Sequence, residues 1–264
     1  MIEPRSEPTS TERLAWVTGA SKGIGRAVVI ELAEQGWQIA ASGRDIAELD
    51  ALTAETNELS GSVHAYPFDI TSEQASSEIV AAIERDLGFI DMAVLNAGTH
   101  ESVDGVAFTV APLRRLVETN LMGTAHCLAP IVERFVARGG GRIAVVASLA
   151  AYRGLPTASA YGATKAALIN MCEALRVELA PAGVVLSVIT PGFVRTPLTD
   201  RNLFPMPFLM EPDVAARRIV RGLAGKRFEI TMPRCFAFIM KLLRILPYPL
   251  YFTVTRRLVT RSEP

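Results

Sequence analysis

TGASKGIG, residues 18–25, is the stretch that decides the fold. It joins a short apolar run at residues 14–18 to a segment with helical periodicity at residues 25–35. Glycine permits a tight turn and a close approach of the backbone to a pyrophosphate, and the N-terminus of the following helix offers free N–H groups to it. The order of strand, glycine-rich turn and helix therefore predicts a dinucleotide-binding turn, with a purely structural turn as the alternative.

Strand-like and helix-like segments alternate along the chain, and the strand-like ones are mostly continuous apolar runs. Such runs are typical of a parallel sheet that is covered on both faces. Strands are expected at residues 14–18, 37–42, 63–68, 90–95, 143–147, 184–190 and 228–231. Helices are expected at residues 25–35, 46–59, 72–87, 113–138, 159–179 and 211–224. The pattern predicts an α/β fold with one doubly wound parallel sheet, Rossmann-like and of about seven strands, in a single domain over residues 12–232.

The 264 residues carry 27 basic and 27 acidic side chains, and half of the residues are hydrophobic. The apolar content excludes a disordered chain, and the balanced charge gives no electrostatic footprint for nucleic-acid binding. The three cysteines are scattered and no metal-binding motif is present, so we expect neither a disulfide framework nor a metal. The polar first residues and the lack of a long uncharged apolar run favour a cytoplasmic protein without a spanning helix.

The end of the second expected strand bears on the choice of dinucleotide. Sites that prefer NAD place an acid there to bind the ribose 2′-hydroxyl, whereas this chain has Ser42-Gly43-Arg44. Arg44 would pair with a 2′-phosphate, and Lys22 would add a second positive contact unless it is a solvated surface lysine. Asp45 is interpreted as the N-cap of the next helix. NADP(H) is therefore expected, and NAD is less favoured.

Tyr161 and Lys165 lie four residues apart in the expected helix 159–179, so they share one face. A nearby ammonium group lowers the pKa of a phenol, which would let Tyr161 exchange a proton with a carbonyl or an alcohol. By spacing alone such a pair is ordinary. Ser148 ends a strand at the sheet edge where open α/β folds bind ligands, and Asn120 stands in mid-helix, where asparagine is a poor helix former.

Together these motifs resemble the short-chain dehydrogenase/reductase family, in its compact branch. The TGxxxGIG turn of the family matches residues 18–25, its NAG motif matches residues 96–98, and its PG motif followed by a threonine matches residues 191–196. Its Asn-Ser-Tyr-Lys tetrad matches Asn120, Ser148, Tyr161 and Lys165. The matches follow the family order and cover residues 12–232.

The resemblance implies a role for each matched residue. Tyr161 would be the general acid/base, and Lys165 would lower its pKa and hold the nicotinamide ribose. Ser148 would orient the substrate oxygen, and Asn120 would maintain a water-linked proton relay to Lys165. The cofactor contacts expected are Gly19, Ser21, Lys22, Gly23, Ile24, Gly25, Arg44, Asp69, Ile70, Asn96, Ala97, Gly98, Tyr161, Lys165, Pro191, Gly192, Val194 and Thr196. The family also implies a homodimer or homotetramer.

The resemblance implies that residues 195–212 form a lid over the substrate, and this stretch is rich in apolar side chains. The expected substrate contacts are Leu149, Tyr152, Leu155, Leu198, Phe204 and Phe208. Such a pocket favours a lipid-, steroid- or aromatic-like carbonyl or alcohol, unless these side chains only pack the lid on the core. We expect an NADP-dependent carbonyl reductase or alcohol dehydrogenase. The alternative is a non-catalytic NADP-binding sensor or scaffold, against which the intact tetrad argues.

Residues 233–264 form an apolar and basic extension. Residues 212–264 carry 11 basic and 3 acidic side chains, against 16 and 24 in the rest of the chain. Pro247 and Pro249 would divide the extension into two short helices. Three roles stay open: contact with an anionic membrane surface, cover for the mouth of the cleft, or a subunit contact. The three histidines, His64, His100 and His126, are interpreted as structural or surface residues.

Overall fold

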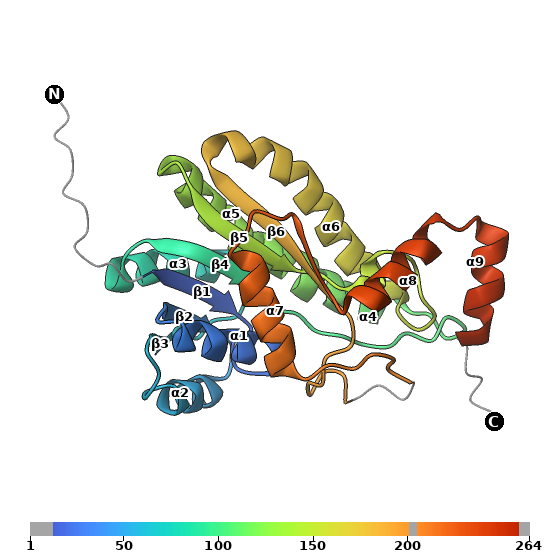
Figure 1. The fold of residues 1–264 in the computed structure, drawn as a ribbon, viewed down its shortest axis with the longest axis horizontal. Coiled ribbons are helices and arrows are strands. Elements are labelled where there is room, and N and C mark those ends of the chain that lie inside the picture. The colour runs from blue at the N-terminus through green and yellow to red at the C-terminus, as the bar shows by residue number, and fades with distance from the viewer. Residues whose placement is uncertain (1–12, 201–204, 259–264) are drawn as a thin grey trace.

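Seven strands form the centre of the molecule within residues 13–200 and 205–258, the part of the chain that this computed structural model describes (Figure 1). They are β1 (Leu14–Thr18), β2 (Gln38–Ser42), β3 (Ser62–Ala65), β4 (Ile90–Leu95), β5 (Gly141–Val146), β6 (Val184–Pro191) and β7 (Glu229–Met232). They make one sheet in the order β3-β2-β1-β4-β5-β6-β7, with every neighbouring pair parallel. The predicted sheet is confirmed. The order reverses between β1 and β4, and such a switch point opens a ligand crevice at the carboxyl ends of the strands.

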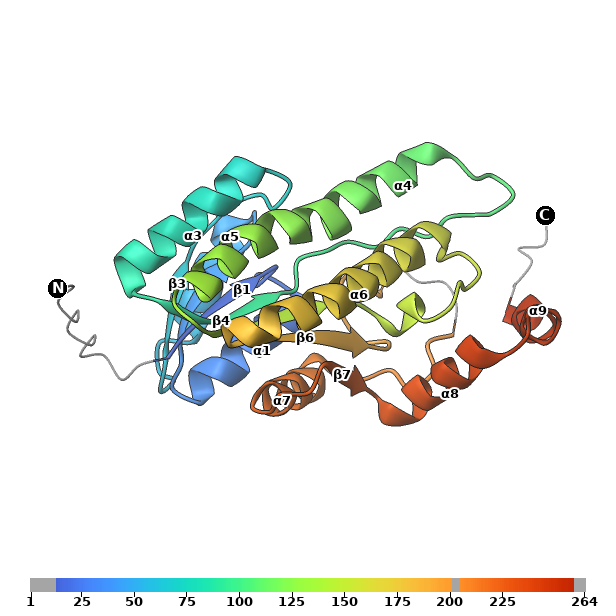
Figure 2. The ribbon, with the colours of Figure 1, turned by 90° about the horizontal axis from the view of Figure 1, so that it is seen from above.

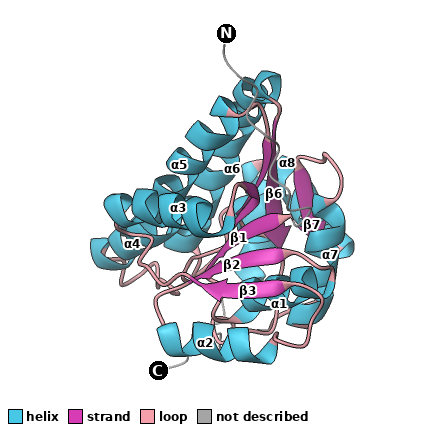
Figure 3. Ribbon diagram, turned by 90° about the vertical axis from the view of Figure 1, so that its left-hand side faces the viewer, coloured by secondary structure: helices cyan, strands magenta, loops and turns pink. Residues whose placement is uncertain are grey.

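Helices cover both faces of the sheet, which explains why its strands are continuous apolar runs (Figure 3). One face is packed by α1 (Gly23–Glu34), α2 (Ile46–Glu55) and α7 (Pro212–Leu223), and the other by α3 (Glu73–Leu87), α5 (Gly123–Ala137) and α6 (Ser159–Leu179). All five residues of β1 are buried. Trp16, the largest of them, satisfies its indole N–H by donating to Ser42 Oγ at 3.0 Å.

The long helix expected at residues 113–138 is not continuous. It consists of α4 (Val110–Leu116), a π-helical turn (Val117–Met122) and α5. The π-helical turn contains Asn120, whose carbonyl accepts a hydrogen bond from Thr124 Oγ1 at 2.7 Å. Such turns inside α-helices are uncommon and occur often at functional sites. The interruption gives a structural reason for an asparagine in this position.

The extension after β7 folds into α8 (Arg234–Ile245) and α9 (Tyr248–Thr255), with Pro247 between them. Both helices lie at one end of the molecule, beyond the carboxyl ends of the central strands (Figures 1 and 2). α8 packs through Ala237 and Met240 onto Leu149 and Tyr152, which follow β5. Every helix in the described part of the chain is too short or too polar to span a bilayer.

Candidate functional site

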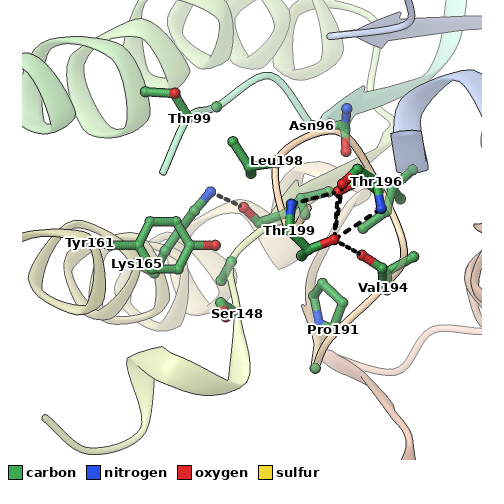
Figure 4. A pocket seen from close by; sticks show the side chains of 15 residues that line it. Asn96, Thr99, Ser148, Tyr161, Lys165, Pro191, Val194, Thr196, Leu198 and Thr199 are labelled. Carbon is green, nitrogen blue, oxygen red and sulfur yellow. Dashed lines mark hydrogen bonds between the residues drawn. The ribbon is translucent and has the colours of Figure 1, made fainter. Parts of the chain in front are cut away.

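A pocket with a cavity volume of about 110 Å³ opens at the carboxyl ends of β4, β5 and β6 (Figure 4). It lies where the reversal of strand order places a ligand crevice. Its lining consists of Ile24, Asn96, Gly98, Thr99, Val146, Ala147, Ser148, Tyr161, Lys165, Pro191, Gly192, Val194, Thr196, Leu198 and Thr199. The pocket thus brings together three members of the expected tetrad and seven of the other expected cofactor contacts, which lie far apart in the sequence.

Tyr161 and Ser148 face the same space from two elements, α6 and the turn that follows β5 (Figure 4). Ser148 Oγ accepts a hydrogen bond from the Ala150 N–H at 3.1 Å, which fixes the oxygen and leaves its O–H to donate. Burial raises the pKa of Tyr161 above its ordinary value, while the hydrogen bond with Ser148 opposes that rise. The phenol is therefore held protonated near neutral pH.

Lys165 is buried beside Tyr161, with only 4% of its surface exposed. Its ammonium donates to the carbonyl of Val146 at 2.8 Å and lies 5.9 Å from the centroid of the Tyr161 ring. Burial lowers the pKa of Lys165 from 10.5 to about 8. In this structure burial has the largest effect on the pKa of Tyr161 and raises it, so the lowering expected from Lys165 stays a prediction.

Asn120, the fourth member of the tetrad, is fully buried and does not line the pocket. Its Oδ1 accepts from the Thr99 N–H at 2.7 Å, and its Nδ2 donates to the Thr99 carbonyl at 2.9 Å and the Thr164 hydroxyl at 3.2 Å. Thr164 lies next to Lys165 in α6. The amide of Asn120 therefore ties the loop after β4 to the helix that carries Tyr161 and Lys165.

The glycine-rich turn closes tightly between β1 and α1. Gly19 has φ +65°, a left-handed conformation that glycine adopts without strain. At Gly25 a Cβ atom would lie 2.2 Å from the Gly19 carbonyl oxygen, so only glycine fits. The amide of Asn96 donates to the carbonyls of Thr18 and Gly19 at 3.0 and 3.1 Å, and so pins the turn to β4.

No side chain caps the N-terminus of α1, whereas Asp45 and Ser72 cap α2 and α3. The first N–H groups of α1 therefore stay available to an anion such as a pyrophosphate. Together with the closed glycine turn, this arrangement fits a dinucleotide.

The tip of β2 carries the groups expected at the adenosine ribose. The Asp45 carboxylate accepts from the Glu48 N–H, so its predicted role as the cap of α2 is confirmed. Lys22 forms an ion pair with Glu48 at 3.3 Å, so its charge is partly engaged. Arg44 is exposed and forms no ion pair with any described residue. Ser21 lies beside Gly43, where an added Cβ would meet its hydroxyl at 3.3 Å.

Two further expected contacts lie after β3. Asp69 accepts hydrogen bonds from the backbone N–H and the hydroxyl of Thr71, at 3.0 and 2.9 Å, which orient its carboxylate. The side chain of Ile70 packs against Gly123 on α5, and its carbonyl lies 3.1 Å from His126 Nδ1. Both residues lie outside the lining of the pocket.

The loop after β6 forms the opposite wall and contains a residue that the sequence did not single out. Thr199 Oγ1 accepts from the Thr196 N–H at 3.0 Å and donates to the Val194 carbonyl at 2.8 Å (Figure 4). These bonds fold the loop back on itself and turn Thr196 and Leu198 toward the pocket. A threonine three residues after Thr196 is the only sequence signal for this role.

The expected substrate wall is only partly at the pocket. Leu198 lines it, whereas Leu149, Tyr152 and Leu155 pack against α8. The Tyr152 hydroxyl bonds to Thr190 and Glu229 instead of facing the pocket. Phe208 is about half exposed and lies 5.8 Å from Phe236 between ring centroids. Phe204 lies outside the described residues.

His100, which the sequence predicts to be a structural or surface residue, is a neighbour of Tyr161. Its ring meets the Tyr161 ring edge-on, with the centroids 4.8 Å apart. Burial lowers the pKa of His100, while Glu101 acts in the opposite direction. Its place four residues after Asn96, in the loop that leaves the switch point, is the signal that would have located it. Among the described residues, no group of three or more His, Cys, Asp or Glu is arranged to hold a metal ion.

Known proteins are similar to this chain in sequence and in fold. Residues 13–203 match the family model described as short chain dehydrogenase. An uncharacterised oxidoreductase of Myxococcus xanthus is 36% identical over 246 residues, which cover 93% of this chain and 97% of the relative. A 3beta-hydroxysteroid dehydrogenase of Mediterraneibacter gnavus is 34% identical over 196 residues, covering 72% of this chain and 69% of the relative. The solved short-chain dehydrogenase from Sphingobium yanoikuyae in complex with NADPH has a TM-score of 0.78 and 25% identity, covering 96% of this chain and 98% of that one.

Proposed function

The chain belongs to the short-chain dehydrogenase family, and on that premise we propose that it is an NADP(H)-dependent oxidoreductase that interconverts a carbonyl and an alcohol. The observation that carries the proposal is the meeting of Tyr161 and Ser148 over one pocket, with the Lys165 ammonium buried beside them. A phenol, a hydroxyl donor and a cation around one pocket suit proton exchange with a carbonyl oxygen.

The reduced nicotinamide, when bound, would supply a hydride to the carbonyl carbon. The chain then has to bind the carbonyl oxygen and deliver a proton to it. Ser148 donates a hydrogen bond to that oxygen, and Tyr161 transfers its phenolic proton as the negative charge develops. Because burial raises the pKa of Tyr161, the phenol is protonated near neutral pH and has a proton to give to the carbonyl oxygen.

Lys165, which lines the pocket, and Asn120, which lies outside its lining, support this proton transfer. The positive charge of Lys165 stabilises the Tyr161 phenolate that remains after the proton has left. Asn120 holds the Thr99 backbone against α6 and so fixes the place of Lys165. The water-linked relay to Lys165 that the family resemblance implies is part of the proposal.

We assign NADP(H) as the cofactor because the tip of β2 offers a cation. Arg44 is exposed and has no ion-pair partner among the described residues, and the nearest acid, Asp45, is engaged as a helix cap. A guanidinium group in this place suits the 2′-phosphate of NADP. The solved similar structure from Sphingobium yanoikuyae is a complex with NADPH, which supports the assignment.

We propose an apolar substrate, of lipid-, steroid- or aromatic-like chemistry. Support comes from Leu198 and Val194 in the pocket lining and from the neighbouring aromatic rings of Phe193, Phe208 and Phe236. The similarity to a 3beta-hydroxysteroid dehydrogenase agrees with this class. We expect the enzyme to act as a homodimer or homotetramer, as the family resemblance implies.

The test is NADPH oxidation measured over a panel of apolar ketones, aldehydes and acyl thioesters, with NADH in parallel. We expect turnover of at least one panel member with NADPH. No turnover of any panel member, with NADPH still bound, would favour the rival function of an NADP sensor or scaffold.

The cofactor assignment has a test of its own. Arg44→Asp should lower kcat/KM for NADPH by roughly 100-fold, because charge-assisted bonds to the 2′-phosphate are lost, and should leave NADH nearly unaffected. Arg85→Asp changes an exposed arginine at the far end of α3 and is the matched control. Equal losses for the two cofactors would contradict the assignment.

A further inference from the structure

The helix pair α8–α9 leaves large apolar side chains in water. Nine of its side chains of this kind are exposed: Phe238, Ile239, Leu242, Ile245, Tyr248, Leu250, Phe252, Val254 and Leu258, the last just after α9. Half of the exposed large apolar side chains found in the described residues therefore fall within residues 234–258. A contiguous set of this kind marks an interaction surface and not a normal solvated surface.

α8 has two apolar faces. One face packs through Ala237 and Met240 onto the loop after β5. The opposite face presents Phe238, Leu242 and Ile245 at spacings of three and four residues, so these side chains form a stripe. A helix with apolar side chains on two faces is normal in a core or a membrane, but α8 lies at the end of the molecule and also carries Arg234, Lys241 and Arg244 (Figure 2).

The charge of this surface limits the partners that fit it. Residues 230–258 contain five basic side chains and no acidic one. Arg234, Arg256 and Arg257 form no ion pair with the described residues, whereas Lys241 pairs with Glu229. Two copies of this surface brought face to face would place like charges together without an acid to pair with them. An anionic partner with an apolar interior is complementary to both properties.

We propose that α8–α9 is a peripheral membrane-binding surface that lies in the interface of an anionic lipid bilayer. Helices with an apolar face, basic side chains and few acids bind such interfaces through buried apolar area and attraction to lipid headgroups. Tyr248 and Phe252 stack with their ring centroids 5.7 Å apart and add amphipathic aromatic area. Neither helix can span the bilayer, so the contact is in the plane of the surface.

The same helix touches the wall of the pocket. A Cβ atom on Gly192, which lines the pocket, would lie 3.0 Å from Phe236 on α8. Phe236 also lies 5.8 Å from Phe193 between ring centroids. The membrane-bound orientation therefore holds the pocket close to the lipid surface, where apolar molecules are concentrated.

Cys235 provides a reporter on the outer side of α8. It is exposed, whereas Cys127 and Cys172 are buried and burial raises the pKa of each of these thiols to about 12. An environment-sensitive thiol fluorophore should therefore label the full chain at Cys235 alone. We expect its emission to shift to the blue with phosphatidylglycerol-containing vesicles, to be quenched by lipids that carry a nitroxide on the acyl chain, and to respond weakly to pure phosphatidylcholine.

Acidic substitutions in the apolar stripe, compared with one at an equally exposed apolar residue elsewhere, test its role. Phe238→Glu/Ile245→Glu should reduce co-sedimentation with anionic vesicles by more than about tenfold, because large apolar side chains leave the bilayer and negative charge replaces them. The control is Val177→Glu on α6, since Val177 is 75% exposed and Ile245 is 76% exposed. NADPH binding should be unchanged in all variants, which shows that they are folded.

Four results would overturn the proposal. Two concern the unsubstituted protein: no blue shift with anionic vesicles, or vesicle binding that does not weaken as the salt concentration rises. Two concern the variants: an equal loss of vesicle binding in Val177→Glu, or unchanged vesicle binding by the double variant. In the last case a fall from dimer to monomer in sedimentation velocity would identify the stripe as a contact between two copies of the chain. Because vesicle binding is measured without substrate, its failure would leave the proposed oxidoreductase activity untouched.

Discussion

The pocket at the sheet edge buries polar side chains, whereas the helix pair α8–α9 exposes apolar ones. Both placements are the opposite of what these residue types usually prefer. In the pocket region Lys165 and Asn120 are polar and buried, and each is bonded to a named partner. In α8–α9 Phe238 and Ile245 are apolar and exposed, with no cover from the described part of the chain. Buried polar side chains with hydrogen-bond partners are typical of a preorganised site inside the protein. Exposed apolar side chains indicate a surface that binds another molecule.

The largest expected contrast concerns two tyrosines, one from each region. Tyr161→Phe removes the proton donor and should lower kcat by about 10³-fold, while NADPH binding stays within a factor of about two. Tyr248→Phe in α9 removes the same hydroxyl from an exposed ring and should leave kcat unchanged. Steady-state kinetics with NADPH titration by fluorescence measures both. Retained turnover in Tyr161→Phe would show that another group donates the proton.

The next contrast separates the two faces of α8. Met240→Ala removes a buried side chain from the inner face and should lower the free energy of unfolding by about 2–4 kcal/mol. Leu242→Ala acts on the outer stripe and should change it by less than about 0.5 kcal/mol. Urea unfolding at constant m-value measures both. Similar losses for the two variants would mean that the outer stripe is covered.

The smallest expected effect concerns the buried charge of the pocket. Because burial lowers the pKa of Lys165, the native state holds its proton less tightly than the unfolded state does. Lys165→Met should therefore raise the free energy of unfolding at pH 7, by about 1–2 kcal/mol after the lost bond to Val146 is subtracted.

The same pKa shift predicts a dependence on pH with a definite sign. Between about pH 8 and pH 10.5 the unfolded state binds more protons at Lys165 than the native state, so the stability contributed by this residue rises with pH. Lys165→Met should lack this rise in urea unfolding carried out across the same window. A parallel pH profile in the two proteins would contradict the assigned pKa.

The fold could be predicted from the sequence because its signals are local. The buried strands are continuous apolar runs, and Gly19 and Gly25 permit a turn that other residues would strain or block. The helix interruption at residues 117–122 was missed, because a π-helical turn has the same apolar periodicity on either side and no composition of its own. Asn120 was the only hint.

Site residues that lie in a sequence motif could be predicted, whereas those whose role depends on tertiary packing could not. Tyr161, Lys165 and Ser148 were found from spacing and resemblance, and they meet at the pocket. His100 and Thr199 reach it through loop geometry that no spacing rule encodes. Tyr152 was expected at the substrate, but the position of α8 and Glu229 turns it away, and this depends on a long-range contact.

Transfer of deuterium tests the central proposal most directly. NADPH that carries deuterium at its hydride-donating carbon is incubated with a ketone from the panel, and the alcohol is analysed by mass spectrometry. The account predicts one deuterium on the carbinol carbon with the wild-type protein and no product with Tyr161→Phe. Consumption of NADPH without labelled alcohol, or equal labelling by Tyr161→Phe, would contradict it.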